Sequence, residues 1–305
     1  MSARLPINPP ADQIGRANVV IGGTSRSYRV DNFEGSLSIK TVVSGLAVWR
    51  AGGRRFEVNE NCWLVLNDRR HYDMSIESRE TTTTFCLFFE RGFVEDICRS
   101  RLLRSSKLLD TPQSDQRLTS AGFFERLESE NSPVLQKVRR FRRAISNGEV
   151  TVDEWEDQYV EIGAALVAAQ RNVVADAAKL SAVKESTRLE LCKRVLRGRD
   201  LLLSSGGRQI TLNQLARESC MSPYHFHRTF RQLFSRTPHA YLTEYRLKRA
   251  AQQLCRTKQT VTEICLQNGF ESLPSFSTLF RKRFGVGPRE FRLANGRIAE
   301  IRKIG

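Results

Sequence analysis

Arginine, histidine and tyrosine side chains are concentrated in the segment 223–234, whose sequence is PYHFHRTFRQLF. Phenylalanines spaced four apart in this segment would share one face of a helix. Tyr224, Arg228 and Arg231 would then point away from that face. Because an arginine side chain can bind O6 and N7 of guanine in bidentate fashion, this outer surface has the chemistry needed to read base edges in a DNA major groove.

The helix that carries these side chains is part of an internal repeat. The segments FHRTFRQLFSRTPHAY and FSTLFRKRFGVGPREF superpose with a shift of 50 residues. The matched pairs are Phe226 with Phe276, Phe230 with Phe280, Phe234 with Phe284, Pro238 with Pro288, and Tyr241 with Phe291. Each proline follows the point where a helix must end. The sequence therefore predicts the same helix-and-stop unit twice.

A shorter helix is predicted before each of these units. Thr211 with Gln214, and Thr260 with Glu263, fit the capping box, in which the first hydroxyl and the fourth side chain satisfy each other's backbone amides. A short turn follows each helix, the second with Gly269 able to take positive φ. Helix, turn, helix is the arrangement that places a second helix in the major groove. A continuous helix over residues 241–254 is expected to hold the two units about one duplex turn, ~34 Å, apart.

The charge of the chain is concentrated in the same region. Residues 186–305 contain 23 Lys and Arg against 8 Asp and Glu, a net charge of +15, whereas residues 1–185 contain 26 against 25. A basic surface gains affinity for a phosphate backbone by releasing counterions. Charge alone would also suit RNA, an acidic membrane surface or a merely solvated face, so the motifs decide in favour of double-stranded DNA.

The C-terminal sequence resembles the AraC/XylS family of bacterial transcription regulators. The resemblance is carried by ITLNQLA, CMSPYHFHRTFRQLF, TPHAYLTEYRLKRA, TVTEICLQNGFESLPSFSTLFRKRFGVGP and the final FR at 291 and 292. It implies a seven-helix DNA-binding domain at 184–295, followed by a tail at 296–305, and an effector-binding or dimerisation domain at 1–183. It also implies a regulator, by expectation an activator, that contacts RNA polymerase.

The resemblance assigns base-reading positions to the two second helices. In the first helix these are Tyr224, His227 and Arg228, with His225 and Arg231 on neighbouring exposed positions. The matching set in the second helix is Leu273, Pro274, Ser277 and Thr278, flanked by Arg281 and Lys282. Proline has no amide and leucine cannot hydrogen-bond a base edge, so the second helix is expected to read thymine methyls, shape or phosphate. Any one of these side chains could instead contact only phosphate.

The N-terminal part is predicted to be α+β. Short runs rich in β-branched and aromatic residues, separated by Gly, Asn, Asp or Ser, indicate a cupin-like β-barrel with strands at about 36–90. Helical periodicity follows at about 92–182, most clearly at 132–146 and 152–170. Their apolar stripes would pack within the domain or form a homodimer interface.

Catalytic chemistry is not expected in this barrel. His71 is its only histidine, whereas a metal-dependent cupin needs several nitrogen and oxygen ligands converging on one point. No metal site, cofactor motif, nucleophile elbow or P-loop is present, and the seven cysteines form no C-x-x-C pair. A small-molecule pocket lined by Trp49, Arg50, Trp63, His71 and Tyr72 is a candidate, with ordinary core packing as the alternative.

Three hypotheses follow from the sequence. The first is a sequence-specific transcription regulator that responds to a small-molecule effector. The second is an architectural or nonspecific nucleic-acid-binding protein, and the third is an enzyme domain fused to a DNA-binding module. The sequence has no apolar run of the ~20 residues that a membrane helix needs, and its start has no signal-peptide pattern. We therefore expect a cytoplasmic protein that is nucleoid-associated when it is bound to DNA.

Overall fold

The computed structural model describes residues 5–104, 122–129, 132–182, 184–204 and 208–294. The chain forms two compact units, Met1–Leu189 and Glu190–Gly305. The division falls a few residues beyond the predicted boundary after residue 183, inside a helix. Each unit is described by itself.

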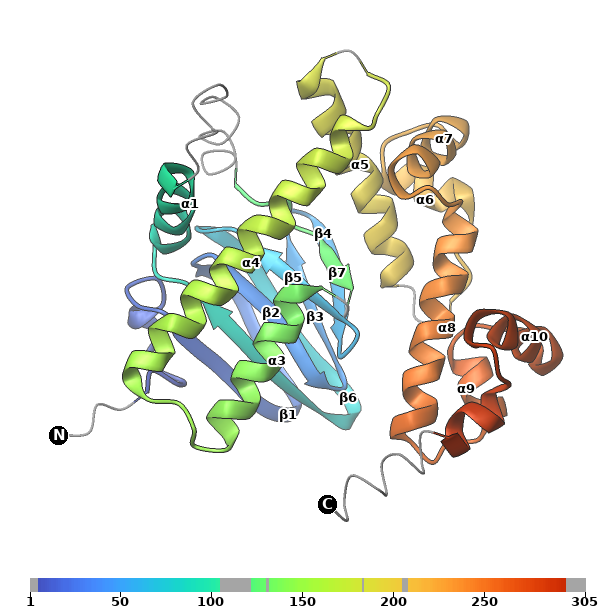
Figure 1. The fold of residues 1–305 in the computed structure, drawn as a ribbon, viewed down its shortest axis with the longest axis horizontal. Coiled ribbons are helices and arrows are strands. Elements are labelled where there is room, and N and C mark those ends of the chain that lie inside the picture. The colour runs from blue at the N-terminus through green and yellow to red at the C-terminus, as the bar shows by residue number, and fades with distance from the viewer. Residues whose placement is uncertain (1–4, 105–121, 130–131, 183, 205–207, 295–305) are drawn as a thin grey trace. The chain divides into compact units, whose positions relative to one another are not determined.

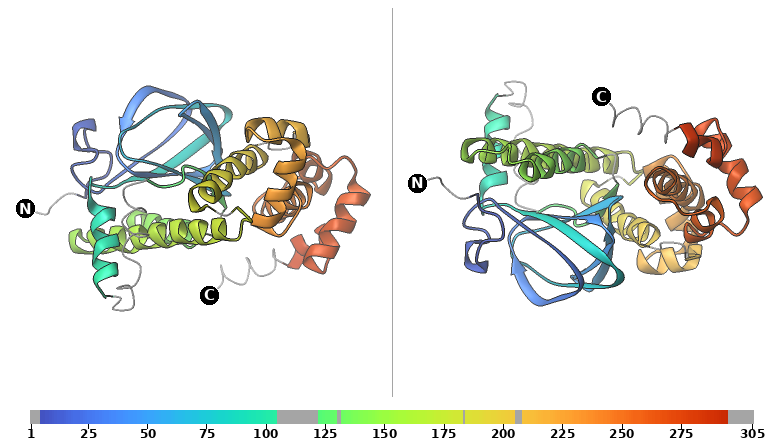
Figure 2. Two further views of the ribbon diagram at one scale, coloured as in Figure 1. Left: turned by 90° about the horizontal axis from the view of Figure 1, so that it is seen from above. Right: turned by 90° about the horizontal axis from the view of Figure 1, so that it is seen from below.

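The N-terminal unit contains a nearly closed antiparallel β-barrel (Figure 1). Its strands are β1 (Val19–Gly35), β2 (Ser38–Ser44), β3 (Leu46–Ala51), β4 (Arg54–Asn59), β5 (Cys62–Leu66), β6 (Arg70–Phe88) and β7 (Leu127–Ser129). They are ordered β4-β3-β6-β2-β5-β7, and β1 pairs along β6. Figure 2 shows the blue and cyan strands curling around a common interior, with the green helices outside. The predicted α+β class with an N-terminal barrel is confirmed.

Two strands lie outside the range of about 36–90 that the sequence predicts. β1 begins at Val19, and most of its side chains are exposed and polar. Backbone hydrogen bonds to the whole length of β6 hold β1 in place. Because β1 does not depend on a buried apolar face, its sequence shows little apolar alternation. β7 lies within the predicted helical range and pairs with β5 through only three residues. So short a strand has no periodicity to detect.

In the described part of this unit, three helices accompany the barrel: α1 (Phe93–Arg104), α3 (Pro133–Ser146) and α4 (Val152–Ala178). A short 3-10 turn, Ala11–Gln13, precedes β1. Ser132 caps α3, and Thr151 forms a capping box with Glu154 at the start of α4. The two predicted helical segments are thus present, and α4 is longer than predicted. The apolar faces of α3 and α4 pack on the outer face of the sheet, where Phe141 lies 5.1 Å from the Trp155 ring.

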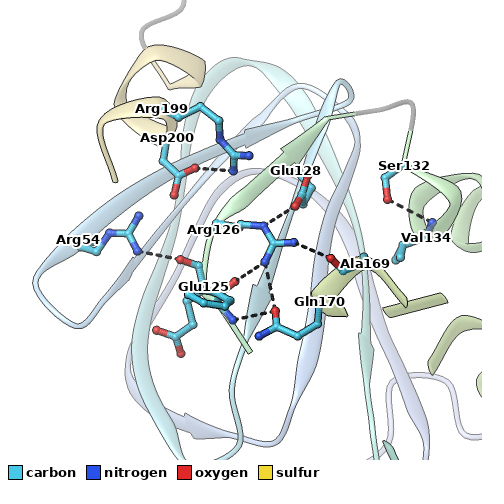
Figure 3. A network of polar contacts seen from close by, with 11 residues as sticks. Arg54, Glu125, Arg126, Glu128, Ser132, Val134, Ala169, Gln170, Arg199 and Asp200 are labelled. Atoms are coloured by element: carbon cyan, nitrogen blue, oxygen red, sulfur yellow. Dashed lines mark hydrogen bonds and ion pairs between the residues drawn. The ribbon is translucent and has the colours of Figure 1, made fainter. Parts of the chain in front are cut away.

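A buried arginine ties β7 to α4. Figure 3 shows the Arg126 guanidinium, whose side chain is 3% exposed, pointing at Glu128 and at the C-terminal half of α4. Arg126 forms an ion pair with Glu128 and donates hydrogen bonds to Gln170 Oε1 at 3.3 Å and to the Ala169 carbonyl at 3.4 Å. Because a buried charge needs such partners, this network fixes the short strand against the helix.

The described secondary-structure elements of the C-terminal unit are all helices. Its helices are α5 (Glu185–Leu203), α6 (Leu212–Glu218), α7 (Pro223–Phe234), α8 (Pro238–Arg256), α9 (Val261–Gln267) and α10 (Leu273–Phe284), and the chain is helical again at 288–294. α8 is the continuous connecting helix that the sequence predicts. α5 packs closely on the first unit of the repeat, since a Cβ on Gly198 would lie 2.6 Å from the Phe226 ring. A larger residue there would push α5 away from α7.

Candidate nucleic-acid interface

The two helix-turn-helix units begin with the same local structure. Thr211 Oγ1 accepts from Gln214 N at 3.2 Å, and the Gln214 side chain accepts from Thr211 N at 2.8 Å. Thr260 and Glu263 make the same pair of bonds at 3.1 and 2.6 Å. The bonds from Thr260 also lower the pKa of the Glu263 carboxyl. Both predicted capping boxes are confirmed.

The turn between the two helices is one residue longer in the second helix-turn-helix unit than in the first. Gly269 takes a φ of +73° in the second turn, as its sequence position predicts. The equivalent position of the first turn is Cys220, with a φ of +50°, a conformation that costs free energy in a residue with a Cβ. Both turns deliver a serine N-cap, Ser222 for α7 and Ser272 for α10, each accepting a backbone N–H at 3.3 Å.

The aromatic repeat forms the same cluster twice. Ring centroids lie 5.5 Å apart for Phe226 and Phe230, and 5.5 Å apart for Phe276 and Phe280. The repeat extends to the edge-on contacts of Phe230 with Tyr241, at 5.6 Å and 87°, and of Phe280 with Phe291, at 5.4 Å and 80°. The sequence superposition is thus also a superposition of packing. The first cluster packs against the inner face of α7 and the second against the inner face of α10. The opposite face of each helix is left to solvent.

The outer face of α7 presents polar side chains. Tyr224 is 76% exposed. His225, Arg228 and Arg231 are exposed, and His227 is half-buried. None of these residues is needed for the aromatic core, so this face is available to a partner. Its donors are those that suit base edges and phosphate oxygens.

The outer face of α10 is less polar. Leu273 is half-buried and packs against the core of its own unit, whereas Pro274 is exposed. Ser277 is half-buried. The exposed Thr278 donates its hydroxyl to the Pro274 carbonyl at 3.0 Å, so that proton is already used within the helix. The flanking cations, Arg281 and Lys282, are exposed. The second helix thus offers fewer free donors than the first.

The five residues proposed as a small-molecule pocket do not form one group. Trp49 and Tyr72 are buried in the barrel, whereas their chain neighbours Arg50 and His71 point outward by the alternation of the strands. His71 lies 3.5 Å from a Glu34 carboxylate oxygen and is more than half exposed. Trp63 belongs instead to the apolar core beneath the helices.

Sequence analysis did not identify Lys40, a buried cation in the barrel. Its neighbour Ile39 joins the core beneath the helices, so alternation turns Lys40 to the inner face of the barrel, where it is 1% exposed. Its Nζ donates to Tyr72 Oη at 2.9 Å and lies 3.6 Å from the centroid of the Phe88 ring. The period-2 pattern of SLSIKTVV could have revealed it, since a strand buried on both faces leaves no outlet for a lysine.

The electrostatic consequence of this burial is large. Burial lowers the pKa of Lys40 to about 7, against a smaller opposing effect of Cys86. Burial also raises the pKa of Tyr72 and of the Cys86 thiol. Within the described part of the chain, no carboxylate pairs with Lys40. The hydroxyl of Ser38, two residues before it on the same face, is buried and has no hydrogen-bond partner among those residues.

The described residues lack two other kinds of feature. These residues contain no group of three or more His, Cys, Asp or Glu side chains that could hold a metal ion. They also include no helix with the length and apolar character needed to cross a membrane.

Comparison with known proteins identifies the C-terminal unit. A family model described as a helix-turn-helix domain matches residues 215–294. The transcriptional regulator ArgR of Pseudomonas aeruginosa is 41% identical over 83 residues, which are 27% of this chain and 25% of that protein. The transcriptional activator RhaS of Yersinia pestis is 41% identical over 66 residues, 22% of this chain and 24% of RhaS. The bifunctional transcriptional activator and DNA repair enzyme AdaA of Bacillus subtilis is 36% identical over 84 residues, 28% of this chain and 40% of AdaA.

These matches span only 24% to 40% of the relatives' own length. Among solved structures, an AraC-type regulator from Chromobacterium violaceum is 28% identical and covers 37% of this chain and 96% of that chain, with a TM-score of 0.32. ToxT from Vibrio cholerae, solved with an unsaturated fatty acid, is 14% identical and covers 92% of this chain and 96% of that chain, with a TM-score of 0.34. At these TM-scores neither likeness adds to the sequence matches.

The residues matched by the family model include both turns, both aromatic clusters and the second capping box, and those features carry the identification. The C-terminal unit of this chain is a helix-turn-helix DNA-binding domain of the AraC/XylS family of transcription regulators.

Proposed function

We propose that the whole chain is a sequence-specific transcription regulator that reads two successive major-groove segments with α7 and α10. The observation that carries this proposal is the polar outer face of α7, where Tyr224, Arg228 and Arg231 are exposed on a helix whose opposite face is locked in an aromatic core. A nonspecific binder would need the positive charge but not two such well-defined helices. We assign base reading mainly to α7, and methyl, shape or phosphate contacts mainly to α10.

Selection of duplexes from a random DNA library by the full-length protein tests this function. We expect an enriched motif with two parts about one helical turn apart, ~10 base pairs, with the more strongly constrained part under α7. The protein should bind duplexes that carry the enriched motif ~10³-fold or more tightly than duplexes without it, at physiological salt. If no motif is enriched and affinity depends only on salt, the architectural alternative is the correct one.

We further propose that the protein is an activator that contacts RNA polymerase, acts in the cytoplasm, and works as a homodimer. The name of the relative RhaS, a transcriptional activator, supports the sign of regulation. The apolar stripes of α3 and α4 are largely buried within the N-terminal unit, so a dimer would have to use their outer faces. We propose no catalytic activity for this protein.

We propose that the barrel receives a small anionic effector at Lys40. An ammonium group that is taken out of water without a carboxylate partner costs free energy, and an anion would offset that cost. Tyr72 and Ser38 add hydrogen-bonding groups on the same inner face. Of the five pocket residues proposed from the sequence, Tyr72 and Trp49 lie on the barrel's buried side, and Tyr72 contacts Lys40 directly.

Thermal unfolding of the full chain with a set of aliphatic and aromatic monocarboxylates tests this site. We expect at least one acid to raise Tm by several degrees and its uncharged amide to leave Tm unchanged, because only the acid neutralises Lys40. Lys40→Met should abolish the shift, and Lys137→Met, at a surface ion pair of the same unit, should not. An acid that binds Lys40→Met as tightly as the natural protein would contradict the proposal.

A further inference from the structure

The two helix-turn-helix units are joined by side-chain bonds in addition to α8. Arg246 lies near the middle of α8. Its Nη1 donates to the Gly269 carbonyl at 3.0 Å, in the turn of the second unit. Its Nη2 donates to the Arg208 carbonyl at 2.8 Å, in the segment that leads into α6 of the first unit. One guanidinium therefore contacts the backbone of both units.

A second bond runs parallel to this one. The Gln209 side-chain amide donates to the carboxylate of Glu271, which follows Gly269 in the turn before α10. Two consecutive residues ahead of the first unit are thus tied to the turn of the second. The tie reaches the turn that sets the direction of α10, whereas α8 alone would link only the ends of the two units.

The chemistry of Arg246 suits a fixed bracket. The guanidinium is planar and offers its donors in a rigid fork, so it holds two acceptors in one geometry. It is half-buried, and burial, together with the nearby Arg249, lowers its pKa. Losing this side chain would leave two carbonyls with poorer partners, since hydrogen bonds from a charged donor are among the stronger ones in proteins.

Each unit is also fixed to α8 locally. Tyr241 of α8 packs on Phe230 and Phe234 of the first unit. Three residues further along α8, Glu244 accepts from Arg283 of α10 at 2.7 Å. These contacts hold each unit to the connecting helix, whereas Arg246 and the Gln209–Glu271 bond link the segment ahead of the first unit to the turn of the second.

We propose that Arg246 is a positioning residue that sets the separation at which the two recognition helices meet one DNA duplex. This inference rests on the proposed function, in which both units bind the same site. Inserting one base pair between the two halves of the site moves the second half by about 3.4 Å and turns it by about 35°. With the Arg246 bonds in place, the two helix-turn-helix units resist this change in separation. Without these bonds, the units adjust to the new spacing more easily.

Arg292 provides a matched control. It is also an arginine that bonds two backbone carbonyls, those of Leu254 at 3.2 Å and Gln259 at 2.6 Å. One acceptor lies in the last turn of α8 and the other in the segment between α8 and α9. Arg292 therefore stabilises the second unit without bonding to the first.

The experiment measures the affinity of full-length protein for its selected duplex and for the same duplex with one inserted base pair. The spacing penalty is the ratio of the two dissociation constants. We expect Arg246→Met to weaken binding to the natural spacing and to reduce the spacing penalty by roughly 3- to 10-fold. Arg292→Met should weaken binding to both duplexes equally and leave the penalty unchanged.

Gln209→Ala is a second test that does not depend on the folding of Arg246→Met. It removes the parallel bond to Glu271 by changing an exposed side chain. It should lower the spacing penalty in the same direction by about 2-fold. A spacing penalty equal to that of the natural protein in both variants would overturn the role of Arg246. Failure of the proposed function would look different, since the natural protein would then select no two-part site.

Discussion

Arg228→Ala is expected to lower affinity for the selected DNA site by roughly 5- to 150-fold, that is by about 1–3 kcal/mol, and to relax the preference at one guanine. Arg228 is exposed on the outer face of α7 and has no role in the aromatic core behind it. The variant should therefore keep its fold and its thermal stability. The measurement is binding of the variant to the selected duplex and to duplexes carrying each other base at the contacted position.

The double variant Ser277→Ala, Thr278→Ala is the matched test of the second helix. Because the Thr278 hydroxyl already donates within α10, removing it should cost little binding, less than about 3-fold. Arg281→Ala should act differently again, with a uniform loss across sequences and a salt slope reduced by about 1, as expected for a phosphate contact. If the double variant abolished site preference while Arg228→Ala retained it, the assignment of base reading to α7 would be wrong.

The duplicated domain could be predicted from the sequence because each of its features is local. A capping box, a proline after a helix and phenylalanines four residues apart all act within one or two turns. Phe226 and Phe276 therefore revealed both the elements and their packing. The left-handed Cys220 could not be predicted in this way, since only its equivalence to Gly269 in the folded turn requires that conformation.

The barrel was less accessible to sequence analysis for a physical reason. β1 is held by backbone bonds to β6 over its whole length, and backbone bonds leave no side-chain pattern. The candidate pocket residues also come from both faces of the strands, because Arg50 and His71 alternate to the opposite face from Trp49 and Tyr72. Contacts between distant strands, such as Lys40 with Tyr72, exist only after the register is set.

Lys40→Met is expected to stabilise the N-terminal unit by a few kcal/mol at neutral pH. The Lys40 pKa is 10.5 in its ordinary state and about 7 when it is buried in the folded chain. Between these values the unfolded chain holds a proton that the folded chain lacks, so raising the pH favours the folded state. The full difference corresponds to about 5 kcal/mol, which is present above pH 10.5 and lost as the pH falls to about 7. Methionine carries no such cost.

The measurement is urea unfolding of the full chain followed by tryptophan fluorescence, because Trp49, Trp63 and Trp155 all lie in the N-terminal unit. The useful window runs from pH 7 to about 8.5. Thiols of the unfolded chain also begin to lose protons there, but all three proteins share them, so the contribution of Lys40 is the difference between the natural protein and Lys40→Met. Over this window Lys40 should add roughly 1–2 kcal/mol to the free energy of unfolding of the natural protein. Lys40→Met should remove this rise, and Lys137→Met, which changes only a surface ion pair, should retain it. A rise of the same size in Lys40→Met would show that the lysine is not buried as a lone cation, and the anion site proposed for the barrel would lose its physical basis.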